Sequence, residues 1–115
     1  MIKIIDDGVK VLRGLLTQYG DSLPTLYILE NTIGAVPRIE RAAAGDYDFK
    51  FPPEALPGMK TLVFIGAGQN TDILCQAAFL GDGWITVVTL DMTAPVPSGT
   101  DNGLNQTSLE IRVYP

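Results

Sequence analysis

The C-terminal stretch of the chain alternates strictly between apolar and polar residues. Between Thr107 and Tyr114, the apolar Leu109, Ile111 and Val113 fall on one side and the polar residues between them fall on the other. This period of two residues is typical of a half-buried β-strand. The chain is therefore predicted to end in a sheet that has one face exposed to water.

Short apolar segments separated by turn residues occupy the chain from Pro24 onward, at spacings typical of a β-sandwich or barrel. They predict seven strands, over residues 25–29, 38–43, 47–51, 61–65, 72–79, 84–90 and 109–114. Two of these segments, 61–65 and 84–90, are apolar on both faces, which predicts strands that are covered on both sides. Residues 71–80 could alternatively form a helix, because so short an apolar run does not distinguish the two.

Residues 6–19 are predicted to form the one α-helix of the chain. Asp6 or Asp7 can cap its first turn, and Gly20 stands where helices commonly end in a left-handed residue. Four residues recur at helical spacing: Val9, Leu12, Leu16 and Tyr19. The expected organisation is a helical segment, residues 1–23, followed by an antiparallel β-sandwich domain of jelly-roll or immunoglobulin-like type, residues 24–115.

The apolar stripe of this helix predicts a role in assembly. Val11 and Leu15 widen the stripe, and a stripe of that width needs a covering surface. We expect the helix to be an assembly or anchoring element that uses four interface residues: Val9, Leu12, Leu16 and Tyr19. Packing of the same stripe inside the monomer is the alternative.

Composition limits the classes of partner. The chain has 115 residues, a formal net charge of −5 and a sequence pI of about 4.4, and its eight basic residues are scattered. Nucleic-acid binding needs a clustered basic surface, so nucleic acid is not an expected partner. No apolar run reaches the roughly 18 residues that span a bilayer, and the N-terminus lacks the features of a secretory signal. We expect no membrane partner and synthesis in a cytoplasm.

The absence of histidine removes the commonest general base and the commonest transition-metal ligand. A serine triad and a histidine-paired cysteine are thereby excluded. The single cysteine, Cys75, lies in an apolar segment and is expected to be a small buried residue. We therefore predict that the protein is not an enzyme, and we assign no catalytic, cofactor-binding or metal-binding residue.

Two motifs allow other interpretations. Gly66-Ala67-Gly68 follows a predicted strand, as in a dinucleotide-binding loop, but Thr71 stands where the third glycine belongs, so a hairpin loop is favoured. The loop from residue 91 to 106 carries oxygen donors of the kind that calcium binds: Asp91, Asp101, Asn102 and Asn105. Their spacing matches no EF-hand, so turn chemistry is favoured here.

Several segments together resemble the small all-β structural proteins of tailed bacteriophages, such as fibre, decoration or baseplate components. They are Leu29-Glu30-Asn31-Thr32-Ile33-Gly34, Ala44-Gly45-Asp46-Tyr47, Phe51 with Lys60-Thr61, Ile85-Thr86-Val87-Val88-Thr89-Leu90-Asp91, and residues 101–114. Where phage modules often have a polar stretch between central strands, this chain has the apolar run from Ile73 to Leu80.

The resemblance implies a non-enzymatic virion structural protein that acts through protein–protein assembly. Its implied partners are other virion proteins and further copies of itself, its implied location is the virion, and it would be made in the bacterial host cytoplasm. A carbohydrate-binding β-sandwich module, with or without calcium, is the alternative. Aromatic residues that could stack on a sugar ring are Trp84, Tyr47, Tyr114 and Tyr27, although aromatic residues on a strand more often occupy core or rim positions, which is the favoured interpretation.

Overall fold

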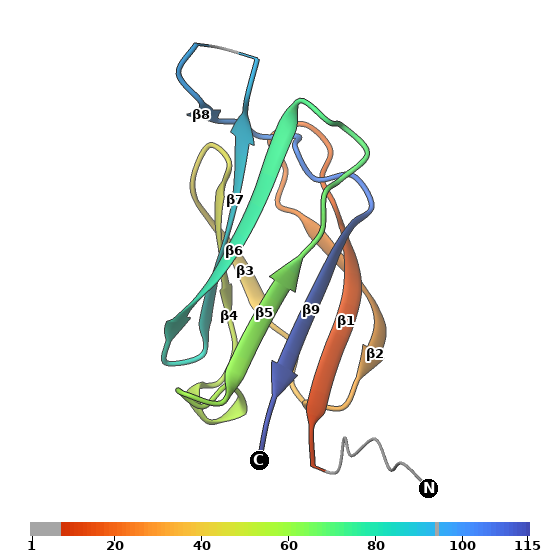
Figure 1. Cartoon of the computed structure of the whole chain (residues 1–115), viewed down its shortest axis with the longest axis vertical. Helices are drawn as coiled ribbons and strands as arrows, with labels where there is room; N and C mark the ends of the chain where they lie inside the picture. The colour runs from red at the N-terminus through yellow and green to blue at the C-terminus, as the bar shows by residue number, and fades with distance from the viewer. Residues whose placement is uncertain (1–7, 94) are drawn as a thin grey trace, which may run out of the picture.

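The computed structural model describes residues 8–93 and 95–115, and within these ranges the fold is mainly β, with two antiparallel sheets (Figure 1). Sheet A has the strand order β2-β1-β9-β5, and sheet B has the order β3-β4-β7-β6, with β8 paired to β7. The strands of sheet A are β1 (Lys10–Thr17), β2 (Thr25–Asn31), β5 (Thr61–Ile65) and β9 (Thr107–Val113). The strands of sheet B are β3 (Arg38–Ala43), β4 (Asp46–Lys50), β6 (Ile73–Gly81), β7 (Trp84–Asp91) and β8 (Ser98–Gly99), and a short 3-10 turn, η1, spans Pro53–Ala55.

The two sheets face each other and enclose one apolar core. Strand alternation directs one set of side chains inward from each sheet. The most deeply buried of them are Leu12, Leu16, Leu109 and Ile111 from sheet A, and Tyr47, Phe49, Ile85 and Val87 from sheet B. Each apolar side chain buried in this way stabilises the fold by about 1.5 to 3 kcal/mol.

The predicted N-terminal helix is wrong, because Lys10–Thr17 form β1. This strand pairs antiparallel with β2 on one side and with β9 on the other. Leu12 and Leu16 are four residues apart, a spacing that suits one face of a helix and equally one face of a strand. Because of this pairing with β2 and β9, β1 is part of sheet A. The expected boundary at residue 23 falls between two paired strands of that sheet, β1 and β2. Asp6 and Asp7 lie outside the described residues.

Gly14 disfavours a helix over residues 6–19 and fits the observed strand. The register of β1 against β2 shifts between Arg13 and Gly14, which marks a bulge in the ladder. A Cβ at Gly14 would lie 2.6 Å from the carbonyl oxygen of Tyr27, so glycine permits this close approach of two backbones. In the middle of a helix, the same glycine would cost about 1 kcal/mol relative to alanine.

The strands predicted from residue 25 onward are confirmed with slightly different ends, and β6 excludes a helix over 71–80. Within the described chain, no element covers the outer faces of β5 and β7, so their coverage by a neighbouring subunit stays a prediction. Leu62 and Phe64 of the edge strand β5 are 47% and 46% exposed, and Trp84 of β7 is 40% exposed. The connection from β5 to β6 passes from one sheet to the other, so its glycines do not form a hairpin loop.

Candidate functional site

A polar cluster around Asp101 ties one end of the two-sheet unit together. The Arg41 guanidinium donates to the Asp101 carboxylate at 2.7 Å, the Gly45 N–H donates to it at 3.1 Å, and the Tyr47 hydroxyl also donates to it. Arg41 and then Tyr47 hold the pKa of Asp101 well below its usual range. Burial and the bond to Asp101 raise the pKa of Tyr47 to about 12. At neutral pH, Asp101 is therefore ionised and Tyr47 is protonated.

The same cluster reaches the loop that follows β1. The side-chain amide of Gln18 donates to the Tyr47 hydroxyl, and its carbonyl oxygen accepts from the Asn102 N–H at 2.8 Å. The Asn102 side chain in turn accepts from the Gly20 N–H at 3.0 Å. These bonds join segments that are far apart in the sequence, so the cluster acts as a structural clasp.

Three of the four loop donors considered for calcium, Asp91, Asp101 and Asn102, have hydrogen-bond partners within the described chain. Asp91 accepts from the N–H of Thr93 at 2.9 Å and from its hydroxyl at 2.6 Å, and these bonds lower the pKa of Asp91. Asp101 is occupied by the clasp. Within residues 8–93 and 95–115, no group of three or more His, Cys, Asp or Glu side chains could hold a metal ion. Asp91 therefore acts as a turn residue whose carboxylate bonds to the residue two positions further on, as turn chemistry predicts.

Gly66 and Gly68, the glycines considered for a dinucleotide-binding loop, pack closely against β9. A Cβ at Gly66 would lie 2.3 Å from the Ser108 hydroxyl oxygen, and one at Gly68 would lie 2.7 Å from the Thr107 hydroxyl oxygen. The segment that follows them is the strand β6, so no helix N-terminus stands there to receive a phosphate. Cys75 of β6 is partly buried and packs against the core.

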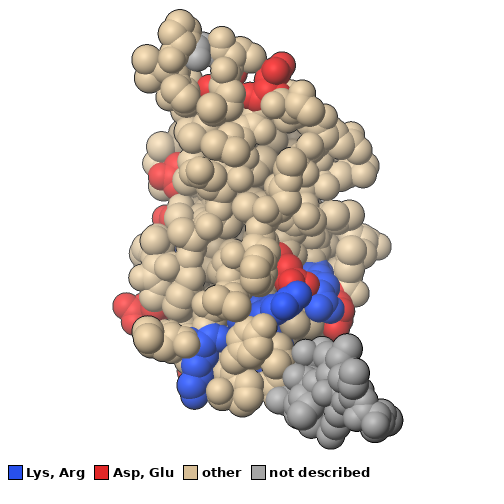
Figure 2. All heavy atoms as spheres, in the orientation of Figure 1, with Lys and Arg blue, Asp and Glu red and all other residues tan. Residues whose placement is uncertain are grey.

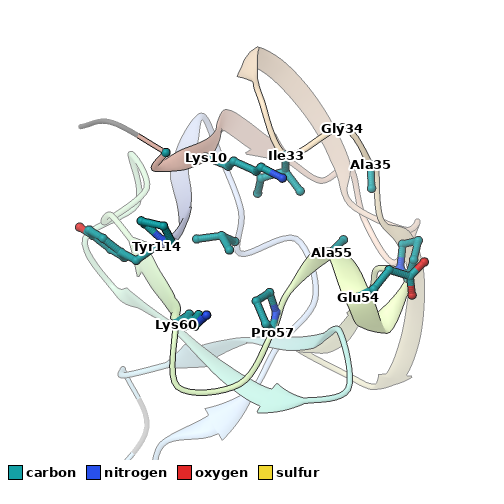
Figure 3. A pocket seen from close by; sticks show the side chains of 13 residues that line it. Lys10, Ile33, Gly34, Ala35, Glu54, Ala55, Pro57, Lys60 and Tyr114 are labelled. Atoms are coloured by element: carbon teal, nitrogen blue, oxygen red, sulfur yellow. The ribbon is translucent and has the colours of Figure 1, made fainter. Parts of the chain in front are cut away.

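A hollow of about 610 Å³ lies near the start of β1 and the end of β9 (Figure 3). Lys10 and Lys60 stand on opposite sides of it, Ile33, Ala55 and Pro57 also line it, and the ring of Tyr114 points away. The two amines make its rim basic.

The outer face of sheet A combines exposed apolar side chains with a row of charges. Tyr27 and Leu29 of β2 are 67% and 63% exposed, and Leu62 and Phe64 lie on the far edge at β5. The charged row crosses the sheet from Glu30 through Arg13 and Glu110 to Arg112. Figure 2 shows that uncharged side chains cover most of the visible face and that the basic ones gather toward its lower end.

The Arg112 guanidinium lies 5.3 Å from the centre of the Phe64 ring, so the charged row reaches the apolar edge. Arg13 contacts Glu30 at 2.6 Å and also bonds Glu110, and the bond from Arg13 lowers the pKa of Glu110. Such surface pairs add at most about 1 kcal/mol each. They orient the side chains of this face more than they stabilise it.

The outer face of sheet B is divided into a polar half and an apolar half. On the β3–β4 half, Glu40 contacts Arg38 at 3.1 Å and Lys50 at 2.7 Å. On the β7–β6 half, the outward side chains are mostly apolar: Trp84, Val88 and Leu90 from β7, and Leu74, Ala78 and Leu80 from β6. The Lys50 amine lies 3.9 Å from the centre of the Trp84 ring, at the boundary between the halves.

β6 forms the free edge of that apolar half. It pairs with β7 on one side and is the last strand of sheet B on the other (Figure 1). A hollow of about 440 Å³ runs along this edge, between Ile65 of β5 and residues 75–78 of β6, with Thr86 and Val88 on its wall. β5 of sheet A approaches this edge, but the two strands share no ladder, so β7 is the only described strand that pairs with β6.

The residues predicted as an assembly interface do not lie together. Leu12 and Leu16 are 0% exposed inside the core, so neither can contact a second chain in this fold, whereas Tyr19 is 79% exposed and Val9 is half-buried. Of the aromatic residues considered for sugar binding, Tyr47 is in the core. The sequence analysis missed the Asp101 clasp and the open β6 edge, although the apolar run from Ile73 to Leu80 was a signal for the second.

Comparison with protein-family models, curated proteins and solved structures finds no match for this chain. Among the described residues, no helix has the length and apolar character that crossing a membrane requires. The candidate site is thus defined by geometry: exposed apolar side chains on two outer faces, and one open strand edge at β6.

Proposed function

We propose that this chain is a non-enzymatic structural protein of a tailed-phage virion and that it acts through protein–protein assembly. In this proposal, the two facing sheets form a β-sandwich module of jelly-roll or immunoglobulin-like type. Other virion proteins and further copies of the chain are its partners. The virion setting is supported by the resemblance of its strand and turn segments to phage structural modules.

One observation carries the assembly role: large apolar side chains remain exposed on the outer faces of both sheets. On sheet A they are Tyr27, Leu29, Leu62 and Phe64, and on sheet B they are Leu74, Leu80 and Trp84, all at least 40% exposed. Extended exposed apolar surface commonly marks a protein–protein contact in soluble proteins. Neighbouring subunits in a symmetric particle would bury it.

Purified virions test the proposal. Particles released from a lysed host culture that carries the gene are banded in a density gradient, and mass spectrometry measures the ratio of this chain to the major capsid protein. We expect the chain to follow the particles at a constant ratio across the band, while a soluble host enzyme stays behind. A chain found only in the soluble fraction would contradict the virion assignment.

A carbohydrate-binding module is the second candidate, and one observation favours it. The ring of Tyr27 is 67% exposed on the outer face of sheet A, where it could stack on a sugar. The Trp84 ring is less suitable because Lys50 lies over it. A glycan array with the wild-type protein and with Tyr27→Ala separates the candidates, since sugar binding that is lost in the variant would support the module.

A further inference from the structure

We propose that β6 is a pairing edge, at which it binds β6 of a second copy in antiparallel orientation and so joins two copies of sheet B into one continuous sheet. This inference rests on the proposed assembly function and names its partner and its contact strand. An edge strand presents unpaired N–H and C=O groups, and strand addition satisfies them. β6 has nine residues and pairs with β7 alone among the described strands.

Apart from the two-residue β8, the other edge strands, β3, β2 and β5, carry features that hinder such pairing. β3 follows Pro37 and contains Arg38, Glu40 and Arg41. β2 contains Glu30 and a bulge against β1, and β5 has only five residues and follows Lys60. From Ile73 to Phe79, β6 has neither a charge nor a proline, and its register shift comes at the turn end of the strand.

A second copy fits this edge because β6 is self-complementary when two copies run in opposite directions. A twofold axis at Ala77, the middle residue of the strand, places Leu74 opposite Leu80, Cys75 opposite Phe79, and Gln76 opposite Ala78. Each β6 residue then meets an uncharged residue, and the small alanines lie at the centre. The axis also brings Leu74 and Leu80, which are 40% and 58% exposed, into cross-strand contact on the outer face.

The charges at the two ends of β6 determine how salt should affect the association of the two copies. The same axis places Asp72 of one copy opposite Asp82 of the other, just outside the paired strands. The two Asp72–Asp82 contacts repel, and salt screens repulsion between exposed charges. The pair should therefore tighten as the salt concentration rises, which is opposite to the behaviour of an interface that depends on ion pairs.

The test compares two alanines on the two edges of sheet B. Ala78 of β6 and Ala42 of β3 are both exposed, so Ala78→Lys and Ala42→Lys make the same chemical change on the open and on the protected edge. Sedimentation velocity at increasing concentration measures the dimer dissociation constant. We expect wild-type and Ala42→Lys to dimerise alike, and Ala78→Lys to weaken the dimer by about tenfold or more.

The register is tested by cross-linking. In a Cys75→Ala background, copies with Gln76→Cys are mixed with copies that carry Ala78→Cys under mild oxidation. Pairing about Ala77 favours a disulfide between the two different variants over a disulfide between identical ones. Thermal melting checks the folding of every variant, and Gln76→Lys replaces Ala78→Lys if the latter unfolds.

The outcomes separate this inference from the proposed function. A wild-type protein that stays monomeric, or equal weakening by Ala78→Lys and Ala42→Lys, would overturn pairing at β6 and leave the virion test untouched. A dimer that depends on Ala78 in a protein absent from virions would instead support the pairing and contradict the virion role.

Discussion

The two edges of sheet B differ in their protection against other strands. At β3, Arg38, Glu40 and Arg41 are charged, and Glu40 and Arg41 form ion pairs with Lys50 and Asp101. At β6, on the other side of the same sheet, no charged residue lies between Ile73 and Gly81. Solvated charges discourage strand addition, whereas an uncharged edge permits it. One protected and one open edge would limit the growth of the sheet to a closed pair.

The largest expected effect is a change in assembly size when the charges that protect β3 are removed. The double substitution Arg38→Thr with Glu40→Val removes two of the three charges of β3 and leaves Arg41, which is held by Asp101, so pairing at this edge becomes possible and can propagate from copy to copy. We expect a broad distribution of assemblies larger than a dimer, measured by light scattering and sedimentation velocity.

Thr86→Val is the matched control, because it adds a valine to the same outer face on the central strand β7. It should leave the mass of the assemblies unchanged. If the β3 double variant also keeps the wild-type mass, edge protection by these charges is refuted.

The second prediction concerns the pH dependence of the free energy of unfolding, which tests the hydrogen bond between Tyr47 and Asp101. The pKa of Tyr47 is about 12 in the folded protein against 10.0 for the ordinary side chain. Between these values the unfolded chain has released the proton and the folded chain keeps it, so rising pH favours unfolding. The free energy of unfolding should be independent of this group below pH 10 and fall by about 2 to 3 kcal/mol between pH 10 and 12.

Tyr47→Phe isolates this contribution, since lysines and the other tyrosines titrate alike in both proteins. Urea unfolding across this pH range should show a steeper decline for wild type than for the variant. Parallel curves would mean that the Tyr47 hydroxyl is not held in its protonated form by the fold.

The smallest effect is expected at the boundary between the polar and apolar halves of sheet B. Lys50→Met removes the contact with the Trp84 ring and the ion pair with Glu40, while it keeps most of the side-chain volume. We expect a loss of about 0.5 to 1 kcal/mol in the free energy of unfolding. Lys60→Met, at an exposed lysine outside the strands, serves as the control in urea unfolding, and equal losses in the two variants would show that the ring contact contributes nothing.

The sequence predicted the strands from residue 25 onward well and β1 badly, and both results have a local cause. In β4 and β9, apolar and polar residues alternate without interruption, which only a strand satisfies. In β1, Leu12 and Leu16 fit two periods at once, and Val11 and Leu15 completed an apparent helical stripe. Gly14, required by the approach of Tyr27, was the residue that favoured the strand.

The candidate site was less predictable, because it depends on which segments become neighbours. The apolar run of β6 was visible in the sequence, but its position at an edge was not. The Asp101 clasp joins Arg41 and Tyr47 to a residue more than 50 positions away in the chain. The periodic pattern of apolar and polar residues within a short segment does not predict a hydrogen bond between such distant side chains.

By itself, the sequence determined where the strands from Thr25 onward run and where turns separate them, because side-chain alternation and turn chemistry are properties of a few consecutive residues. It also excluded histidine chemistry. Only the tertiary structure decided that residues 10–17 are a central strand, that β5 and β6 are edges of different sheets, and that the outer faces stay uncovered by the described chain. Those properties depend on pairing between distant segments, whose partners are selected by the burial of one shared core.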